Sequence, residues 1–302
     1  MNNKNNYKSR ANSTRMILSN ISWNNGISNY FKNNIPWQLS TGTHFAERLI
    51  RLWLENQKEK NTYYLLELGC GSGMLSYNIL NILKKNHPLI YENTTIYITD
   101  GNQTQLDNIS SSKIFNEHKD HITFKCIDVL QKIPRFNHKF DLIFFTNLID
   151  SLPTHHIIKN DTTLNELVIE DKINPNLRLL DTFSTQLKNL SDTDIEKLIK
   201  SNNDYKLSIM GSDIVENIEE KYHSISLEKS KLTKKIRHKI KSFCKTVPKE
   251  KNFVFNIQPD FITMIDQLLE KNPQALIIGN DFGASNLTEF NCAYESLLAS
   301  YG

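Results

Sequence analysis

The chain has 302 residues, of which 39% are hydrophobic and 23% charged, and its formal net charge is +3. A chain of this size buries a large core, as one big domain or as one domain with an insertion. So small a net charge does not by itself argue for a nucleic-acid partner. The four cysteines form no CxxC pair, which argues against structural zinc and a disulfide framework, and no metal site is expected. No apolar run approaches the length of a membrane span.

Residues 1–60 are predicted to form a tail followed by a helical segment. Residues 1–46 contain no Asp or Glu and begin with the Asn-rich "MNNKNNYKSR". A basic, acid-free start is also typical of an organelle transit peptide. Because Asn is frequent along the whole chain, we expect a cytoplasmic protein, with an organelle matrix as the alternative. Apolar residues recur near helical spacing over residues 43–58, which predicts an amphipathic helix.

Strands and helices alternate over residues 61–154 and again over residues 256–302. Strands are predicted at residues 65–68, 95–99, 122–126, 140–145 and 275–281. Helices are predicted at residues 74–85, 103–115 and 259–272. The fourth strand, "FDLIFF", is apolar enough to be buried on both faces. Alternation of this kind predicts an α/β fold, a Rossmann-like parallel sheet with helices on both faces.

Residues 155–255 separate the fourth strand from the fifth. This stretch is polar and rich in Lys and Asn, and it includes "LSDTDIEKLIKS" and "SLEKSKLTKKIRHKIKSFCKTV". We expect a mostly helical insertion that caps the carboxyl edge of the sheet. Its basic cluster is interpreted as a solvated face, with binding of an anionic partner as the alternative. The cluster comprises Lys234, Lys235, Arg237, Lys239 and Lys241.

Three glycines stand at every second position between the first strand and its helix, in "ELGCGSG". Glycine weakens regular structure by about 0.5–1 kcal/mol relative to alanine, so three together indicate a sharp turn or a close approach to a ligand. The spacing differs from the G-x-G-x-x-G of dinucleotide sites. The preceding Glu67 is unfavourable for a phosphate but favourable for a sulfonium and an ammonium group. A tight structural turn is the alternative.

"ELGCGSG" resembles the "E/D-x-G-x-G-x-G" motif of Rossmann-like methyltransferases. The resemblance implies S-adenosylmethionine as cofactor, with Asp100 of "IYITD" on the ribose hydroxyls and Asp128 beside the adenine amine. Each acid taken alone is compatible with an ordinary helix cap or surface residue, but Glu67, Asp100 and Asp128 at the ends of three successive strands favour a common site. The cofactor-binding residues expected from the resemblance are Glu67, Gly69, Cys70, Gly71, Gly73, Asp100, Asp128, Val129 and Thr146.

"TNLIDSLP", residues 146–153, resembles the "NEFFDALP" signature of the MidA family, relatives of the mitochondrial complex I assembly methyltransferase. "LIIGNDFG" is similar to that family's "LLLIDYG". The resemblance implies methyl transfer, and the best-known relative methylates a protein arginine. Thr146 and Asn147 replace the family's Asn-Glu, which removes the carboxylate that would orient a guanidinium.

The catalytic candidates lie at the ligand edge of the fourth strand. They are Asp150, Asn147 and Thr146. Asp150 is expected to accept the acceptor's proton or to orient the acceptor, unless it merely caps the turn into "SLP". His155 and His156 are alternative general bases. Asp281 either lines the acceptor pocket or ends its strand.

The acceptor is expected to be a protein or peptide side chain. Alternatives are a small metabolite, with the insertion as a lid, and a non-catalytic cofactor-binding assembly protein. A membrane partner is not expected and nucleic acid is disfavoured. A full sheet of this kind ends with two further strands, for which little chain remains. The sequence therefore leaves open a naturally short chain, a fragment, or a dimer or partner chain that completes the core.

Overall fold

The computed structural model describes residues 8–9, 41–131, 133–149, 151–173, 218–247 and 253–281. The chain divides into two compact units. One consists of Pro36–Ser151 and Asp266–Gly302, and the other of Met1–Ile35 and Leu152–Ile265. We call them the parallel-sheet unit and the antiparallel-sheet unit.

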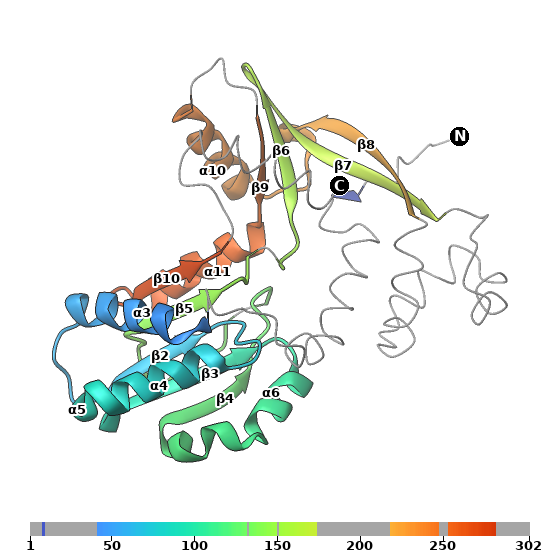
Figure 1. Ribbon diagram of the computed structural model, residues 1–302. Helices are drawn as coiled ribbons and strands as arrows, with labels where there is room; N and C mark the ends of the chain where they lie inside the picture. Colours follow the sequence, from blue (N-terminus) through green and yellow to red (C-terminus); the bar gives the residue numbers. More distant parts are fainter. Residues whose placement is uncertain are drawn as a thin grey trace, which may run out of the picture. The chain divides into compact units, whose positions relative to one another are not determined.

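The parallel-sheet unit contains five parallel strands in the order β10-β5-β2-β3-β4 (Figure 1). Their bounds are Tyr63–Glu67 for β2, Thr94–Asp100 for β3, Ile122–Cys126 for β4, Leu142–Thr146 for β5 and Leu276–Asn280 for β10. In the centre of the sheet, Leu65 lies opposite Ile96 of β3 and Leu142 of β5. All five predicted strands are confirmed, and so is the Rossmann-like parallel sheet.

Helices cover the strands of this sheet, and their bounds follow the sequence pattern closely. They are α3 (Thr43–Asn56), α4 (Met74–Asn86), α5 (Pro88–Glu92), α6 (Gln103–Ser110) and the 3₁₀ helix η2 (Lys113–His121). The boundary between the two units falls within α11 (Pro259–Lys271). The predicted helix over residues 103–115 is broken, because α6 ends at Ser110 and a 3₁₀ helix follows. Among the described residues, no helix combines the length and apolar composition needed to cross a membrane.

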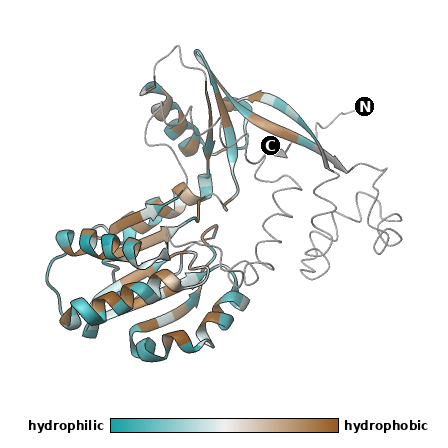
Figure 2. Cartoon of the chain, in the orientation of Figure 1, coloured by the Kyte–Doolittle hydropathy of each residue, from teal (hydrophilic) through white to brown (hydrophobic). Residues whose placement is uncertain are grey.

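The core of the parallel-sheet unit lies between α3, α4 and the central strands. Trp53 of α3, Leu83 of α4, Leu65 of β2 and Phe144 of β5 are fully buried there. Both helices also carry hydrophilic residues, as the hydropathy colouring shows (Figure 2). Burying one such side chain completely stabilises the fold by about 1.5–3 kcal/mol. The sheet is therefore held firmly behind the loops at its carboxyl edge.

The antiparallel-sheet unit pairs its strands in the order β1-β7-β6-β9, with β8 along the other side of β7. The bounds are Lys8–Ser9 for β1, His155–Asn160 for β6, Thr163–Ile173 for β7, Ile218–Ser226 for β8 and Phe253–Ile257 for β9. The 3₁₀ helix η3 (Leu227–Lys229) and α10 (Lys234–Lys245) follow β8. Ile236 and Ile240 of α10 pack with Ile157 and Ile257 of the sheet.

The expectation of a mostly helical insertion is wrong for the part of residues 155–255 that the structure describes. Strands β6, β7, β8 and β9 occupy most of it, and α10 is the α-helix among them. The "LSDTDIEKLIKS" stretch lies outside the described residues. The hairpin of β6 and β7 turns through two residues between Asn160 and Thr163, and the first of them, Asp161, has φ +45°. A two-residue turn with positive φ suits the twist of paired strands.

Candidate functional site

The glycine loop, residues 69–73, joins β2 to α4 through three left-handed residues. The φ angles are +65° at Gly69, +55° at Gly71 and +73° at Gly73. A side chain in this region costs roughly 1–2 kcal/mol. At Gly69 an added Cβ would also lie 2.8 Å from Leu148 Cδ1, and at Gly73 3.2 Å from Ile109 Cγ2. The backbone conformation therefore favours glycine at all three positions, and a side chain at Gly69 or Gly73 would also displace its neighbours.

Backbone hydrogen bonds fix the glycine loop to the neighbouring strands. The Leu68 amide donates to the Phe144 carbonyl (3.0 Å), and the Cys70 amide donates to the Thr99 carbonyl (2.8 Å). The Thr99 hydroxyl donates in turn to the Glu67 carbonyl at 2.6 Å. The loop is thus bound to β3 and β5 as well as to β2, at the carboxyl edge where ligands bind in such sheets.

Gly71 at the centre of the loop has both its peptide groups held by side chains. Its N–H donates to Asp100 Oδ2 at 3.1 Å, and its carbonyl accepts from Gln105 Nε2 at 2.6 Å. The second oxygen of Asp100 accepts from the Asn102 amide at 3.0 Å. Asp100 ends β3 and Gln105 lies in the first turn of α6, so the next strand and helix together set the position of Gly71.

Gln105 was not among the residues predicted from sequence. The sequence did carry a signal for it, since Asn102 precedes Gln105 by three residues and this spacing is typical of a helix start. The structure shows that the Asn102 side chain caps α6 by accepting from the Gln105 amide at 3.2 Å. The Gln105 side chain is buried and reaches Gly71 instead of the cap.

Glu67 lies beneath the glycine loop with only 3% of its surface exposed. Its carboxylate accepts from the Ser76 hydroxyl of α4. The pKa of Glu67 is raised to about 8, mainly because the group is buried; the hydrogen bond from Ser76 opposes the rise and the charge of Asp100 adds to it. A cation placed near this carboxyl group would favour its charged form. The site therefore suits a ligand that brings a positive charge of its own.

Asp100 and Cys70 share this weakly solvated environment. Burial raises the pKa of Asp100, while hydrogen bonds from the amides of Asn102, Gly71 and Gly101 lower it. Burial, followed by the charges of Glu67 and Asp100, raises the pKa of the Cys70 thiol well above its usual value. Cys70 is therefore a neutral thiol within the loop rather than a reactive thiolate.

The structure places Asp128 and Val129 beside Asp100. The Ile127 amide donates to the Asp100 carbonyl at 2.8 Å, and an added Cβ at Gly101 would lie 3.8 Å from Asp128 Cα. The carboxylate of Asp128 accepts from the Leu130 amide at 2.9 Å, so Asp128 also caps its own turn. Val129 is buried. The predicted cofactor residues that follow β2, β3 and β4 therefore meet at one edge.

The segment after β5 holds Thr146 and Asn147 at the same edge. Thr146 lies opposite Asn280 of β10, and Asn147 has φ +48° while its amide donates to the Asn280 carbonyl at 2.9 Å. Asp281 Oδ2 accepts from the Ile149 amide at 2.5 Å. Asp281 thus fastens the chain that leaves β5. Asp150 lies outside the described residues.

His155 and His156 belong to β6 in the antiparallel-sheet unit. His155 Nδ1 lies 2.7 Å from Glu166 Oε1 of β7, and the Glu166 side chain is almost completely buried. The glycine loop belongs to the parallel-sheet unit, so the alternative role of these histidines as general bases stays a prediction.

Known structures resemble the chain in fold. An uncharacterised COG1565 superfamily protein from Burkholderia thailandensis is 9% identical with a TM-score of 0.52, and the match covers 94% of this chain and 59% of that one. A COG1565 superfamily structure from the same organism, bound to S-adenosyl-homocysteine, is 8% identical with a TM-score of 0.45 and coverage of 91% and 49%. The chain thus spans about half to three-fifths of their lengths.

The plantazolicin methyltransferase BpumL, in complex with the same ligand, is 13% identical with a TM-score of 0.33, and the match covers 87% of this chain and 91% of that one. No curated protein gives a significant match. The sequence profile of one family, described as "Putative S-adenosyl-L-methionine-dependent methyltransferase", matches residues 44–291. Because this match covers well over half of the chain, the protein belongs to that family.

Proposed function

We propose that the protein is an S-adenosylmethionine-dependent methyltransferase whose acceptor is a protein or peptide side chain. The observation that carries the proposal is the pair of side-chain hydrogen bonds to the N–H and the carbonyl of Gly71. Asp100 and Gln105 fix the two peptide groups of a left-handed glycine above a buried carboxyl group. A loop that served only to turn the chain would not need a glutamate with so high a pKa beneath it.

The residues at this edge fit the cofactor's chemistry. Glu67 complements a positive charge, Asp100 offers a carboxylate to vicinal hydroxyl groups, and the buried Val129 provides apolar surface beside Asp128. When bound, S-adenosylmethionine supplies an activated methyl group on a sulfonium. The chain's own contribution is then to orient the acceptor and exclude water.

Thr146, Asn147 and Asp150 are the proposed acceptor-side residues. Asparagine is one of the few residues that adopt positive φ readily, so Asn147 suits its backbone better than the glutamate found in the MidA signature. Asp281 holds the following amide, that of Ile149, and so restricts the segment that leads to Asp150. We assign Asp150 the role of proton acceptor or orienting acid.

Two observations support a macromolecular acceptor. One is the similarity of residues 146–153 to the MidA signature. The other is the antiparallel-sheet unit, which has its own sheet and core and therefore offers a second folded surface to a peptide.

Two measurements test the proposal in sequence. Calorimetry with S-adenosylmethionine and S-adenosylhomocysteine should show a single site, and binding of NAD in their place would overturn the cofactor assignment. Incubation with methyl-labelled cofactor and cell extract should then place label in the protein fraction. Label only in small molecules would refute the acceptor class, and cofactor binding without any transfer would refute the enzymatic role.

A further inference from the structure

Positive charge is especially dense in one short segment of the chain. Residues 229–247, "KSKLTKKIRHKIKSFCKTV", contain eight Lys or Arg side chains and no Asp or Glu. The remaining 28 Lys and Arg side chains are outnumbered by the 33 Asp and Glu side chains, all of which lie elsewhere. The net charge of +3 therefore conceals a strongly basic patch on an otherwise acidic chain.

Helix α10 displays much of this charge on a single face. Ile236 and Ile240 are buried against the antiparallel sheet. Lys234, Lys241 and Lys245 are exposed, and their spacing places them on the opposite side of the helix. Lys229 and Lys231, in the turn that leads into the helix, are exposed as well. We call these five lysines the lysine face.

The charge pattern opposes formation of the helix that carries it. The first turn of α10 holds Lys234 and Lys235 and no acidic residue, although the positive end of a helix dipole favours acids. Lys241 lies four residues from both Arg237 and Lys245, and like charges at this spacing repel. An anion bound at the lysine face would relieve this repulsion.

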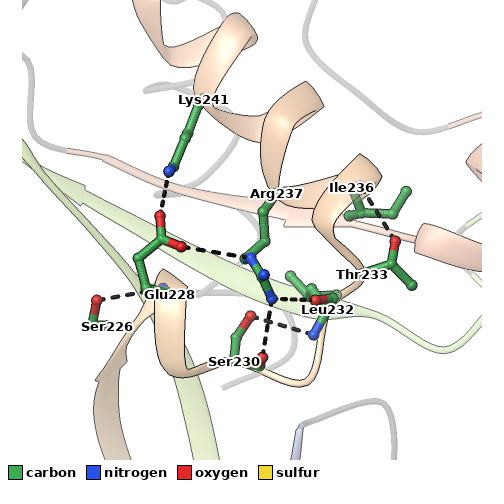
Figure 3. A network of polar contacts seen from close by, with 8 residues as sticks. All are labelled: Ser226, Glu228, Ser230, Leu232, Thr233, Ile236, Arg237 and Lys241. Atoms are coloured by element: carbon green, nitrogen blue, oxygen red, sulfur yellow. Dashed lines mark hydrogen bonds and ion pairs between the residues drawn. The ribbon is translucent and has the colours of Figure 1, made fainter.

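One carboxylate of the chain itself, that of Glu228, already forms ion pairs with basic side chains of α10. Glu228 of η3 pairs with Lys241 Nζ, and its second oxygen lies 3.8 Å from Arg237 Nε (Figure 3). Arg237 also donates to the Leu232 carbonyl at 2.6 Å, which fixes its guanidinium. Within the described ranges, Lys229, Lys231, Lys234 and Lys245 have no such carboxylate.

We propose that the lysine face binds an acidic, extended segment of a partner protein. Alternate residues of an extended chain are about 6.6 Å apart, close to the rise of about 6 Å between helix positions four residues apart. Carboxylates two residues apart would therefore match Lys241 and Lys245, where the partner competes with Glu228 for Lys241. Lys234 lies seven residues before Lys241, a rise of about 10.5 Å, and would meet a carboxylate further along the segment. This binding surface is independent of methyl transfer.

The same features argue against nucleic acid as the occupant. Proteins that bind single strands combine cations with aromatic stacking platforms. The aromatic ring of α10, Phe243, is 47% exposed but lies on the side of Ile236 and Ile240 rather than on the lysine face, with its centroid 5.3 Å from that of Phe255.

Fluorescence anisotropy with the full chain tests this proposal. The probe is a labelled Glu-Gly repeat of about ten residues, enough to span the helix. A Gln-Gly repeat and a single-stranded oligonucleotide of equal length serve as comparisons. The test variant is Lys234→Gln/Lys241→Gln/Lys245→Gln. The matched control, Lys58→Gln/Lys85→Gln/Lys119→Gln, removes the same charge from exposed positions of the parallel-sheet unit.

The wild type and the control should bind the acidic peptide with similar affinity, and the test variant should bind it at least tenfold more weakly. Raising the salt from about 50 mM to about 500 mM should weaken wild-type binding. Circular dichroism and cofactor binding should be unchanged in both variants. Equal losses in test variant and control, tighter binding of the oligonucleotide, or equal binding of the Gln-Gly peptide would each overturn the proposal.

Discussion

The Asp100 carboxylate accepts a hydrogen bond from the Gly71 amide at 3.1 Å, although the two residues lie on different βα connections. The contact makes the end of β3 a part of the glycine loop. Because Asp100 is also the acid proposed for the ribose hydroxyls, one side chain both shapes the loop and faces the ligand edge. Substituting Asp100 itself would affect both roles, so variants at Gly71 and Gln105 are used to test the loop.

Gly71→Val should abolish cofactor binding. A β-branched residue at φ +55° is a steric outlier and would cost roughly 1–2 kcal/mol from the backbone alone. Gly101→Ala is the matched control, since its added Cβ would meet Asp128 Cα at an ordinary 3.8 Å. Calorimetry should show no binding by the valine variant and near-normal binding by the control. Normal binding by Gly71→Val would mean that the loop does not approach the cofactor.

Gln105→Leu should weaken cofactor binding about 5- to 30-fold without touching the cofactor. The substitution leaves the Gly71 carbonyl without its donor, a loss worth about 1–2 kcal/mol. Gln103→Leu, on the exposed side of the same helix, removes only a contact with Asp107 and should change affinity less than twofold. If both variants bind equally well, Gln105 does not position the loop.

Because the pKa of Glu67 is raised, we expect protein stability and cofactor affinity to change in opposite directions with pH. Its pKa is raised in the folded state from 4.5 to about 8, so the folded protein holds a proton that the unfolded chain has lost. Its contribution to the free energy of unfolding should therefore decrease as the pH rises from about 4.5 to about 8. Cationic cofactor should bind more tightly over the upper part of this range, because the charged carboxylate is then available.

Glu67→Gln removes the titrating group while keeping an acceptor for the Ser76 hydroxyl. In this variant, denaturant unfolding should no longer show the decrease in stability between about pH 4.5 and about pH 8. Calorimetry should no longer show the increase in cofactor affinity over the upper part of this range. Calorimetry in buffers of different ionisation enthalpy should show proton release on cofactor binding by the wild type only. Identical pH profiles for the two proteins would contradict the assignment.

The parallel sheet could be predicted from sequence because its strands are short apolar runs buried on both faces. Phe144 and Leu65 belong to such runs, and the glycines after β2 identified the connection that faces the ligand. The hold on Gly71 by Gln105 could not be predicted, because it depends on how α6 lies against the loop. The spacing of Asn102 and Gln105 indicated a helix start, but it did not indicate that the Gln105 side chain donates to the Gly71 carbonyl.

The antiparallel strands were missed for a different reason. Residues 155–173 mix apolar residues with Lys, Glu, Asn, Asp and Thr, and the buried Lys159 and Glu166 interrupt the apolar alternation to which Ile157 belongs. Buried charged residues in a strand contradict the usual apolar pattern. Their partners are tertiary, as the pair of His155 and Glu166 shows. The two-residue turn at Asp161 carried no glycine to reveal the hairpin.

Asp150→Asn should lower turnover by roughly 10²–10⁴-fold, the usual worth of a positioned acid–base group, and leave cofactor affinity nearly intact. The segment before Asp150 is fastened at Ile149 by Asp281, so the substitution should not displace the chain. If Asp150 only caps the turn into "SLP", asparagine would cap nearly as well and stability would fall by at most about 1 kcal/mol. Asp120→Asn, an exposed position in η2, is the matched control and should retain full turnover. Single-turnover rates with saturating labelled cofactor, measured per folded molecule, decide between the two roles, because unchanged turnover in Asp150→Asn would remove Asp150 from the catalytic residues.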